Sequence, residues 1–454
     1  MKDNMKNILR KYYCYIPLKY RMGIYYIRIR RFLNKSQWWD RDKIENWQLQ
    51  KLKHIVKYAY LNVSGYYSLY KNAGIKPEDI LTLNDIKLLP FVTKELIRDN
   101  LNDFTSRTIS KEKLIYVTTG GSTGIPLGFF QTKLDESMEV AFMHTGWQRI
   151  GWSFDDTSIV LRGKFIGSKE KFWKFDSCRK ELLLSSYHLN EQTYSKYVKK
   201  ILEYKPLYLK AYPSMATILS DLILNRNDVG KINFKAILLG SENIYPWQKE
   251  MLSTAFPGAK VFAWYGQSEQ VILAPMCEYS DQYHVWPFYG LTEIIKKTES
   301  DEVGELVGTS FWNYATPFIR YRTMDMGTNG KMVCHKCGRH FHLIKNIEGR
   351  LQDYLVTKDG AYIPVTALIF AQHFKAFGTI KNIQLYQKKI GEVIVKIVPT
   401  NKYSQEDDSE IKGKIEKAVD GRITVLIEHV NEISRTSRGK YKVVDQKINI
   451  KYGV

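Results

Sequence analysis

The sequence is short of cysteine and of long apolar runs, and each shortage excludes a class of protein. Only five of its 454 residues are cysteine, at positions 14, 178, 277, 334 and 337. They are too few and too scattered for a disulfide scaffold, which favours a reducing compartment. No apolar run reaches the roughly 18 residues that a membrane-spanning helix needs, and the N-terminus lacks the apolar stretch of a secretory signal peptide. We therefore expect a cytoplasmic protein.

Acidic residues are also scarce, since 47 Asp and Glu stand against 68 Lys and Arg and leave a net charge of +21. Such a balance suits nucleic acid, anionic lipid or phosphorylated ligands, or it reflects genomic composition alone. The chain contains no known nucleic-acid-binding module and no zinc-finger spacing of the DNA-reading kind. We expect no nucleic-acid partner.

The basic residues are concentrated at the N-terminus. Residues 1–35 hold ten Lys and Arg, one acid (Asp3) and several interleaved tyrosines. Basic groups with interfacial aromatics suit a membrane surface, so residues 1–40 are one candidate for peripheral contact with the inner membrane surface. The alternative is a helix that packs on the body of the protein and keeps its charges in water.

Apolar patterning predicts a large α/β domain of mixed sheets and helices at 41–349, and a small, mobile α+β domain at 350–454. The spacing at 41–60 is helical, and an extended segment is expected at 88–97. Short apolar runs at 157–163, 207–213, 235–242 and 260–269 alternate with helical patterns at 216–223 and 247–256, which is typical of βαβ units. Farther on, the pattern predicts two strands within 382–400, a helix at 409–419 and a strand at 422–430.

A turn rich in glycine and hydroxyl residues, YVTTGGSTGIPL, spans 116–127. Glycines let backbone N–H groups approach a phosphate closely, and hydroxyls add further donors. The turn is not a Walker A loop, because no Gly-Lys-Ser/Thr follows. It is either a flexible surface loop or a phosphate cradle made by Thr118, Thr119, Gly120, Gly121, Ser122, Thr123 and Gly124.

Four further stretches follow the turn in order: AWYGQSE (263–269), TPFIRYRTMD (316–325), GRLQD (349–353) and RTSRGK (435–440). Together the five resemble the ordered motifs of the AMP-forming adenylating enzymes of the acyl-CoA synthetase superfamily. Within it the chain looks like the phenylacetate–CoA ligase group, and closest to the branch associated with capsular polysaccharide biosynthesis. The stretches at 47–67, 89–100 and 238–248 match that branch too, so the resemblance runs from about residue 40 to the end.

The resemblance implies a role for each motif. The turn at 118–124 would hold the β- and γ-phosphates of ATP, and Glu269 would bind Mg²⁺, a cation that prefers carboxylate and phosphate oxygens. Asp325 would accept hydrogen bonds from the ribose hydroxyls. Lys440, in the small domain, would bridge the attacking carboxylate and the α-phosphate, where a fixed cation offsets developing charge. Further ATP-site residues implied are Gly240, Ser241, Glu242, Trp264, Tyr265, Gly266, Ser268 and Arg350, with Tyr265 against the adenine. The acyl pocket would draw on Tyr212, Pro213, Ser214 and the 141–148 segment.

Three positions depart from the usual family pattern. Met324 stands where glycine is usual before Asp325, Ser434 where proline is common, and Gln352 at the hinge position. None removes a charged catalytic group, so the resemblance still implies an active enzyme.

The reaction implied is a two-step ligation. A carboxylate attacks ATP to give an acyl-adenylate and pyrophosphate, and the acyl group then passes to a nucleophile while the small domain swings about 349–353. The acceptor candidates are the thiol of CoA and an amine of a sugar nucleotide or lipid-linked glycan. A different class of function, a non-catalytic binding or assembly protein of a polysaccharide machinery, stays open as the alternative.

Cys334 and Cys337 form a C-x₂-C pair, which is half of a tetrahedral zinc site. Cys277 and His284 are candidates for the other half if their stretch meets 334–337 as a neighbouring hairpin near the active-site face. His335, His340 and His342 compete for the fourth position. The cluster is either a structural Cys₃His zinc site or a pair of reduced thiols beside a turn.

Overall fold

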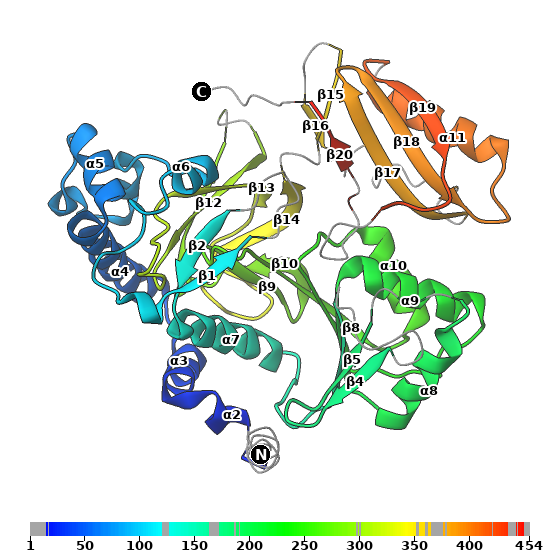
Figure 1. Ribbon diagram of the computed structural model, residues 1–454, viewed down its shortest axis with the longest axis horizontal. Helices are drawn as coiled ribbons and strands as arrows, with labels where there is room; N and C mark the ends of the chain where they lie inside the picture. The colour runs from blue at the N-terminus through cyan, green and yellow to red at the C-terminus, as the bar shows by residue number, and fades with distance from the viewer. Residues whose placement is uncertain are drawn as a thin grey trace. The chain divides into compact units, whose positions relative to one another are not determined.

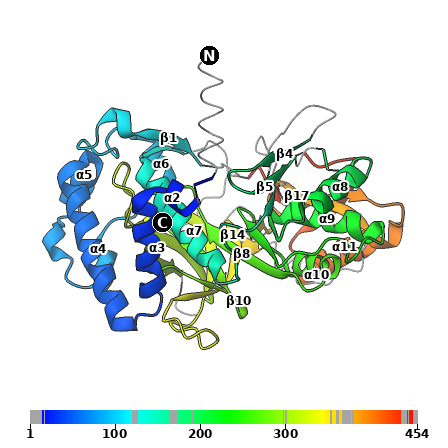
Figure 2. The same cartoon turned by 90° about the horizontal axis from the view of Figure 1, so that it is seen from below.

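The computed structural model describes residues 15–16, 18–119, 127–162, 172–185, 188–189, 191–296, 298, 301–350, 354–358, 362–364, 376, 379–419, 421–434, 442 and 444–448 (Figures 1 and 2). The chain divides into two compact units. The first contains Met1–Glu242 and Ser253–Ile347, and the second contains Asn243–Leu252 and Glu348–Val454. Each unit is described by itself below.

The first unit is built on a twelve-stranded sheet among the described residues, in the order β11-β12-β13-β14-β10-β9-β8-β7-β6-β3-β5-β4. One half is antiparallel: β9 (Leu273–Cys277), β10 (Ser280–His284), β11 (Gly290–Ile295), β12 (Val303–Ser310), β13 (Tyr321–Asn329) and β14 (Leu343–Arg350). The other half is parallel except for its edge strand β4: β3 (Ser158–Leu161), β4 (Trp173–Asp176), β5 (Glu181–Leu184), β6 (Tyr208–Ala211), β7 (Ala236–Gly240) and β8 (Lys260–Gly266).

The parallel strands form where the sequence has short, continuous apolar runs. Every residue of β6 and of β7 is buried, as expected for strands covered on both faces. Because β3, β6, β7 and β8 run parallel, their carboxyl ends meet at one edge of the sheet. That edge is where α/β folds place their ligands.

Helices α7 (Lys133–Gln148), α8 (Tyr194–Tyr204), α9 (Pro213–Asn225) and α10 (Pro246–Ala255) connect these strands. A capping box starts α7, since the Asp135 carboxylate accepts hydrogen bonds from the backbone and hydroxyl of Thr132. Proline at the first position starts α9, where its missing N–H costs nothing. The expected alternation of strands and helices is confirmed.

The N-terminal helices are α2 (Leu18–Arg21), α3 (Gly23–Ser36), α4 (Arg41–Asn62) and α5 (Ser64–Asn72). Figures 1 and 2 show α3 beside α7, and the buried side chains of Tyr26, Ile29 and Leu33 lie on the packed face of α3. The Tyr26 hydroxyl also lies 3.0 Å from Nδ1 of His144. The packed-helix interpretation therefore holds for α3. No helix among the described residues combines the length and apolar character needed to cross a bilayer.

The extended segment predicted at 88–97 is wrong in its second half. Val92 makes a single bridge to Tyr321, and α6 (Lys94–Asp99) begins two residues later. The Thr93 hydroxyl accepts a 3.2 Å hydrogen bond from the Leu96 backbone N–H and so caps the helix. Short 3₁₀ helices lie at η1 (Pro77–Asp79), η2 (Leu83–Leu88) and η3 (Lys111–Lys113).

The second unit has the expected α+β character. Its described strands are β15 (Tyr354–Val356), β16 (Tyr362–Pro364), β17 (Ile380–Lys389), β18 (Glu392–Pro399), β19 (Thr424–His429) and β20 (Val444–Gln446), with helix α11 (Gln405–Ala418). A four-stranded sheet has the order β19-β18-β17-β20. Val393 and Val395 of β18 pack in one core with Ile411 and Ile415 of α11. The predicted strands and helix at 382–430 are confirmed.

Candidate functional site

Two of the sequence motifs are joined by a pair of hydrogen bonds. The Tyr265 hydroxyl, at the end of β8, donates to Oδ2 of Asp325 on β13 over 2.8 Å. The Tyr321 hydroxyl, at the start of β13, donates to Oε1 of Glu269 over 2.9 Å. The motifs 263–269 and 316–325 are therefore parts of one site.

Both carboxylates of this site are largely withdrawn from water, with 6% of Glu269 and 5% of Asp325 exposed. Burial, followed by the charge of Asp325, raises the pKa of Tyr265 well above its ordinary value, so this tyrosine keeps its proton and stays a donor. Each tyrosine contacts one oxygen of its carboxylate. Carboxylate oxygens are the acceptors that a metal ion or ligand hydroxyls use, so both groups have the chemistry of a nucleotide site.

The motif 316–325 is held in place by two arginines, of which Arg320 is buried and Arg322 is partly exposed. The Arg320 guanidinium donates to the backbone oxygens of Lys87 and Leu89 (2.8 and 2.7 Å) and pairs with Glu293. Arg322 pairs with Glu305 over 2.6 Å, and the same carboxylate accepts from the Met324 backbone N–H. These contacts fix the backbone that carries Asp325.

Met324 shows why glycine is the usual residue before this aspartate. Its φ angle is +63°, in the left-handed region that a side chain enters at a cost of about 1–2 kcal/mol. The structure accommodates methionine by leaving its side chain 36% exposed. Asp325 still contacts Tyr265, so the departure strains the backbone of β13 without removing the contact.

Two strands flank the glycine-rich turn in the sequence, β1 (Ile115–Thr118) and β2 (Gly128–Gln131), and they pair antiparallel. Thr119 closes its base, because its backbone N–H donates to the Leu127 oxygen (2.9 Å) and its hydroxyl accepts from the Leu127 N–H (3.0 Å). Gly120, Gly121, Ser122, Thr123 and Gly124 lie outside the described residues. On β2, the Phe130 N–H donates to the Thr316 hydroxyl over 3.0 Å, so the stem of the turn reaches the motif 316–325.

The ends of β7 and β8 meet at the expected edge. Gly240 pairs with Trp264, and a Cβ on Gly240 would lie only 2.5 Å from the indole, so no larger residue fits there. Ser241 follows with a φ of +69° and an exposed side chain. The Glu242 carboxylate accepts from the backbone N–H and the hydroxyl of Ser214 (2.9 and 3.1 Å), which joins the predicted adenine edge to the predicted acyl pocket. Tyr212 and Pro213 lie at the start of α9. Gly266 ends β8, Ser268 follows two residues later, and both are exposed.

Arg162 directly follows β3 at this same edge, and the sequence offered no motif to find it. Its guanidinium lies 4.7 Å from the centre of the Trp264 ring, and burial lowers its pKa to about 10. Its Nε and Nη2 are buried and make no hydrogen bond with the residues that the structure describes. Beside Trp264 lies a small apolar hollow lined by Phe142, Met143, Gly146, Trp147, Leu273, Pro275 and Trp286, which includes part of the predicted 141–148 segment.

The structure describes no side chain for three of the residues singled out in the sequence. Lys440 and Gln352 lie outside the described residues, and Arg350 is the last residue of β14, where only the backbone is described. Their roles remain predictions from the motifs.

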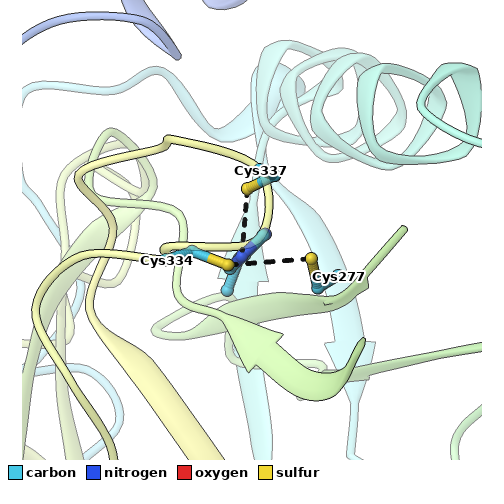
Figure 3. Close-up of side chains that lie close together, drawn as sticks. Cys277, Cys334 and Cys337 are labelled. Atoms are coloured by element: carbon cyan, nitrogen blue, oxygen red, sulfur yellow. Dashed lines mark hydrogen bonds between the residues drawn. The ribbon is translucent and has the colours of Figure 1, made fainter. Parts of the chain in front are cut away.

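The four predicted zinc ligands form a cluster. One ligand atom from each of Cys277, His284, Cys334 and Cys337 lies within 4.8 Å of the other three. Figure 3 shows the sulfur atoms of the three cysteines turned toward a common space. The competing His342 is engaged elsewhere, with Nε2 at 2.7 Å from Oδ1 of Asn329. The predicted meeting of the two stretches is confirmed.

The chain is similar in sequence to CapK and to phenylacetate-coenzyme A ligases. Residues 355–447 match the family described as the CapK C-terminal domain. Protein CapK of Staphylococcus aureus is 24% identical over 398 residues, which cover 87% of each protein. A phenylacetate-coenzyme A ligase of Aromatoleum evansii is 26% identical over 333 residues, or 70% of this chain and 73% of that enzyme.

The fold has solved counterparts. A 2-hydroxyisobutyryl-CoA ligase, solved in the postadenylation state with R3-HIB-AMP, gives a TM-score of 0.72 at 16% identity over 91% of each chain. The same ligase was solved with 2-HIB-AMP and CoA in the thioesterification state, with a TM-score of 0.59 at 17% identity over 91% of this chain and 92% of that one. The chain is thus a homologue of CapK and of the phenylacetate-coenzyme A ligases, and it has the fold of the AMP-forming CoA ligases.

Proposed function

We propose that the protein activates a carboxylic acid with ATP as an acyl-adenylate and transfers the acyl group to a nucleophile. The observation that carries the proposal is the joining of Tyr265 to Asp325 and of Tyr321 to Glu269. In a fold shared with AMP-forming ligases, these two hydrogen bonds bring Glu269, the candidate metal ligand, and Asp325, the candidate ribose acceptor, into one buried site. ATP is a substrate here, and Mg²⁺ would be held by Glu269, because this cation prefers carboxylate and phosphate oxygens.

The division of labour follows from the chemistry of the first step. Asp325 orients the ribose, the turn at 118–124 receives the phosphates, and Lys440 places a cation between the attacking carboxylate and the α-phosphate. Positioning and charge stabilisation carry most phosphoryl-type chemistry, so these residues need no covalent role. Rotation of the small domain about 349–353 would then withdraw Lys440 and admit the acceptor.

The acceptor is either CoA or an amine. The similarity to phenylacetate-coenzyme A ligases supports the thiol, and the similarity to CapK is compatible with an amine of a sugar nucleotide or lipid-linked glycan. Pyrophosphate release over a panel of carboxylic acids tests the first step. Adding CoA or amino sugars, with mass spectrometry of the products, then identifies the second. Absence of release with every acid would favour the non-catalytic assembly protein.

Arg162 is expected to recognise the acid substrate. A buried guanidinium with unused donors beside Trp264 is costly unless a bound ligand supplies acceptors, so we expect the acid to carry a carboxylate or hydroxyl that reaches it. Arg162→Met should raise the KM for the acid roughly ten- to a hundredfold, the worth of one charge-assisted hydrogen bond. The KM for ATP should change little.

The matched control for Arg162 is Arg226→Met, which alters an arginine that is exposed on the protein surface. If both variants show the same KM for the acid as the parent protein, Arg162 does not contact the substrate. Acid-dependent pyrophosphate exchange is measured in the parent protein in the same series. Its absence would show that the proposed function is wrong, which is a different result from an unchanged KM in Arg162→Met.

Membrane contact is proposed only for the segment 1–17, because α3 packs on the body. Four basic residues precede position 18, each worth about 1 kcal/mol near an anionic surface, and Tyr15 and Ile16 are exposed. The full chain should pellet with vesicles rich in phosphatidylglycerol at low salt and be released by about 0.5 M salt, where the Debye length is short. A chain lacking 1–17 should stay in the supernatant. Equal pelleting of the two forms would exclude this segment as the contact.

A further inference from the structure

The dimensions of the cysteine–histidine cluster fit a tetrahedral metal centre. The sulfur atoms of Cys277 and Cys334 are 3.8 Å apart, and the Cys337 sulfur is 3.6 Å from Nε2 of His284. With Zn–S bonds of about 2.3 Å and Zn–N bonds of about 2.1 Å, a tetrahedron has edges of about 3.8 Å between two sulfurs and about 3.6 Å between sulfur and nitrogen. Two opposite edges of the cluster therefore already have the required lengths.

Other uses of these thiols fit less well. A disulfide needs its sulfurs about 2.05 Å apart, far closer than the Cys277–Cys334 pair. An iron–sulfur cluster is usually held by four thiolates, whereas this group offers three and an imidazole. Three soft thiolates and one imidazole at tetrahedral spacing are the donor set of a structural zinc site.

The local backbone is built to present these side chains. In the C-x₂-C turn, the Gly338 N–H donates to the Cys334 oxygen over 2.8 Å, and Gly338 has a φ of +78°, which glycine adopts freely. Cys277 and His284 are the last residues of β9 and β10, two antiparallel neighbours. The hairpin and the turn thus each supply two ligands without rearrangement of the chain.

The buried charges around the cluster include one arginine, Arg149, whose charge no carboxylate offsets directly among the described residues. Arg149, which follows α7, is buried against Trp286, with its guanidinium 4.3 Å from the ring centre and Nη1 3.3 Å from Nδ1 of His284. Its Nε and Nη2 make no hydrogen bond, and no carboxylate pairs with it among the described residues. The neighbouring Arg339 and Glu278 neutralise each other over 2.6 Å.

With neutral thiols, this buried region holds one uncompensated positive charge, an arrangement that costs several kcal/mol. Three thiolates and one imidazole around Zn²⁺ carry a net charge of −1, which compensates Arg149. The geometry and the charge are separate observations, and a zinc ion held by three thiolates and one imidazole satisfies both.

We propose that Cys277, Cys334, Cys337 and Nε2 of His284 bind one structural zinc ion, and that Arg149 is its counter-charge. Zinc on Nε2 leaves the imidazole proton on Nδ1, so the Arg149 contact to Nδ1 opens and the guanidinium turns toward the thiolates. All four positions are filled by protein, which leaves no open position for catalysis.

The ion joins three separate parts of the first unit. It links the β9–β10 hairpin to the 334–337 turn. Arg339, two residues after that turn, contacts the segment between α3 and α4: it donates to Oε1 of Gln37 (3.1 Å) and lies over the ring of Trp38. On β9, Ala274 pairs with Tyr265, and Cys277 lies three residues further from that pair, about 10 Å along the strand. The cluster is therefore away from the active-site face, contrary to the sequence-based expectation.

Elemental analysis of the full chain tests occupancy. We expect about one zinc per chain after purification without added metal, and loss of most of it in Cys334→Ser and in Cys337→Ser, with a lower Tm. The matched control is His335→Ala, an exposed residue of the same turn outside the cluster, which should keep zinc and Tm. Parent protein that contains less than about 0.1 zinc per chain when expressed with ample zinc, and keeps its Tm after chelation, would overturn the proposal.

Two further measurements stay informative if the serine variants fold poorly. Co²⁺ exchanged into the parent protein should give the strong visible bands of tetrahedral cobalt with thiolate-to-metal charge transfer. A weak octahedral spectrum would contradict the site.

Arg149→Gln should lose zinc to a competing chelator at least tenfold more readily than the parent, and Arg149→Lys should recover most of the difference. Equal zinc retention in Arg149→Gln and the parent would refute the counter-charge.

Discussion

Lys440→Ala is expected to abolish acid-dependent pyrophosphate release, with a fall of at least about 10²–10³-fold, the usual cost of removing one group that stabilises transition-state charge. The attacking carboxylate and the α-phosphate are both anions, so without a cation between them their repulsion opposes the first bond-forming step. The motif RTSRGK places this lysine near the end of the small domain. The measurement is the initial rate of pyrophosphate release at saturating acid and ATP.

The proposed role of Lys440 also predicts that the variant retains the second step of the reaction. Because the lysine acts in the first step only, transfer from a chemically prepared acyl-adenylate to the acceptor should proceed at nearly the parental rate. Lys442→Ala, two residues along the same segment, is the matched control and should leave both steps unchanged. A Lys440→Ala variant that forms adenylate at the parental rate would remove the lysine from the mechanism.

The large features of the fold could be predicted because their causes are local in the sequence. β6 and β7 are buried on both faces, so they appear as short, continuous apolar runs, and α9 begins at a proline that follows such a run. The error at 94–97 has a local cause as well. The apolar pairs on either side of Pro90 and Thr93 suggested a strand, but the threonine hydroxyl caps a helix instead.

The candidate site was predictable only where a motif marks it. C-x₂-C spacing pointed to Cys334 and Cys337, and the motif order pointed to Glu269 and Asp325. Arg149 and Arg162 lie in no such motif. Single arginines are common, and these two are distinctive because they are buried with nitrogens that make no hydrogen bond among the described residues. That burial arises from contacts with Trp286 and Trp264, far along the chain, which periodicity does not reveal.

The second large effect is expected at the two buried carboxylates, whose variants should differ in their dependence on metal. Asp325→Ala removes the acceptor of both ribose hydroxyls. At about 1.5 kcal/mol or more for each hydrogen bond to a charged group, kcat/KM for ATP should fall on the order of a hundredfold. Excess Mg²⁺ should not restore it, because the lost contacts are to the nucleotide.

Glu269→Gln keeps the shape of the side chain and its place beside Tyr321 but removes the charge that holds Mg²⁺. Its rate should fall by a similar order and rise again as Mg²⁺ is increased, because weaker binding is offset by mass action. Tyr265→Phe and Tyr321→Phe are the matched controls, since each removes the donor to one carboxylate while leaving its charge in place. Each should lower kcat/KM for ATP much less than loss of the carboxylate that the tyrosine contacts.

Rates measured across a Mg²⁺ titration separate the two roles. Identical Mg²⁺ dependence in Asp325→Ala and Glu269→Gln would show that the carboxylates do not act on ribose and metal separately.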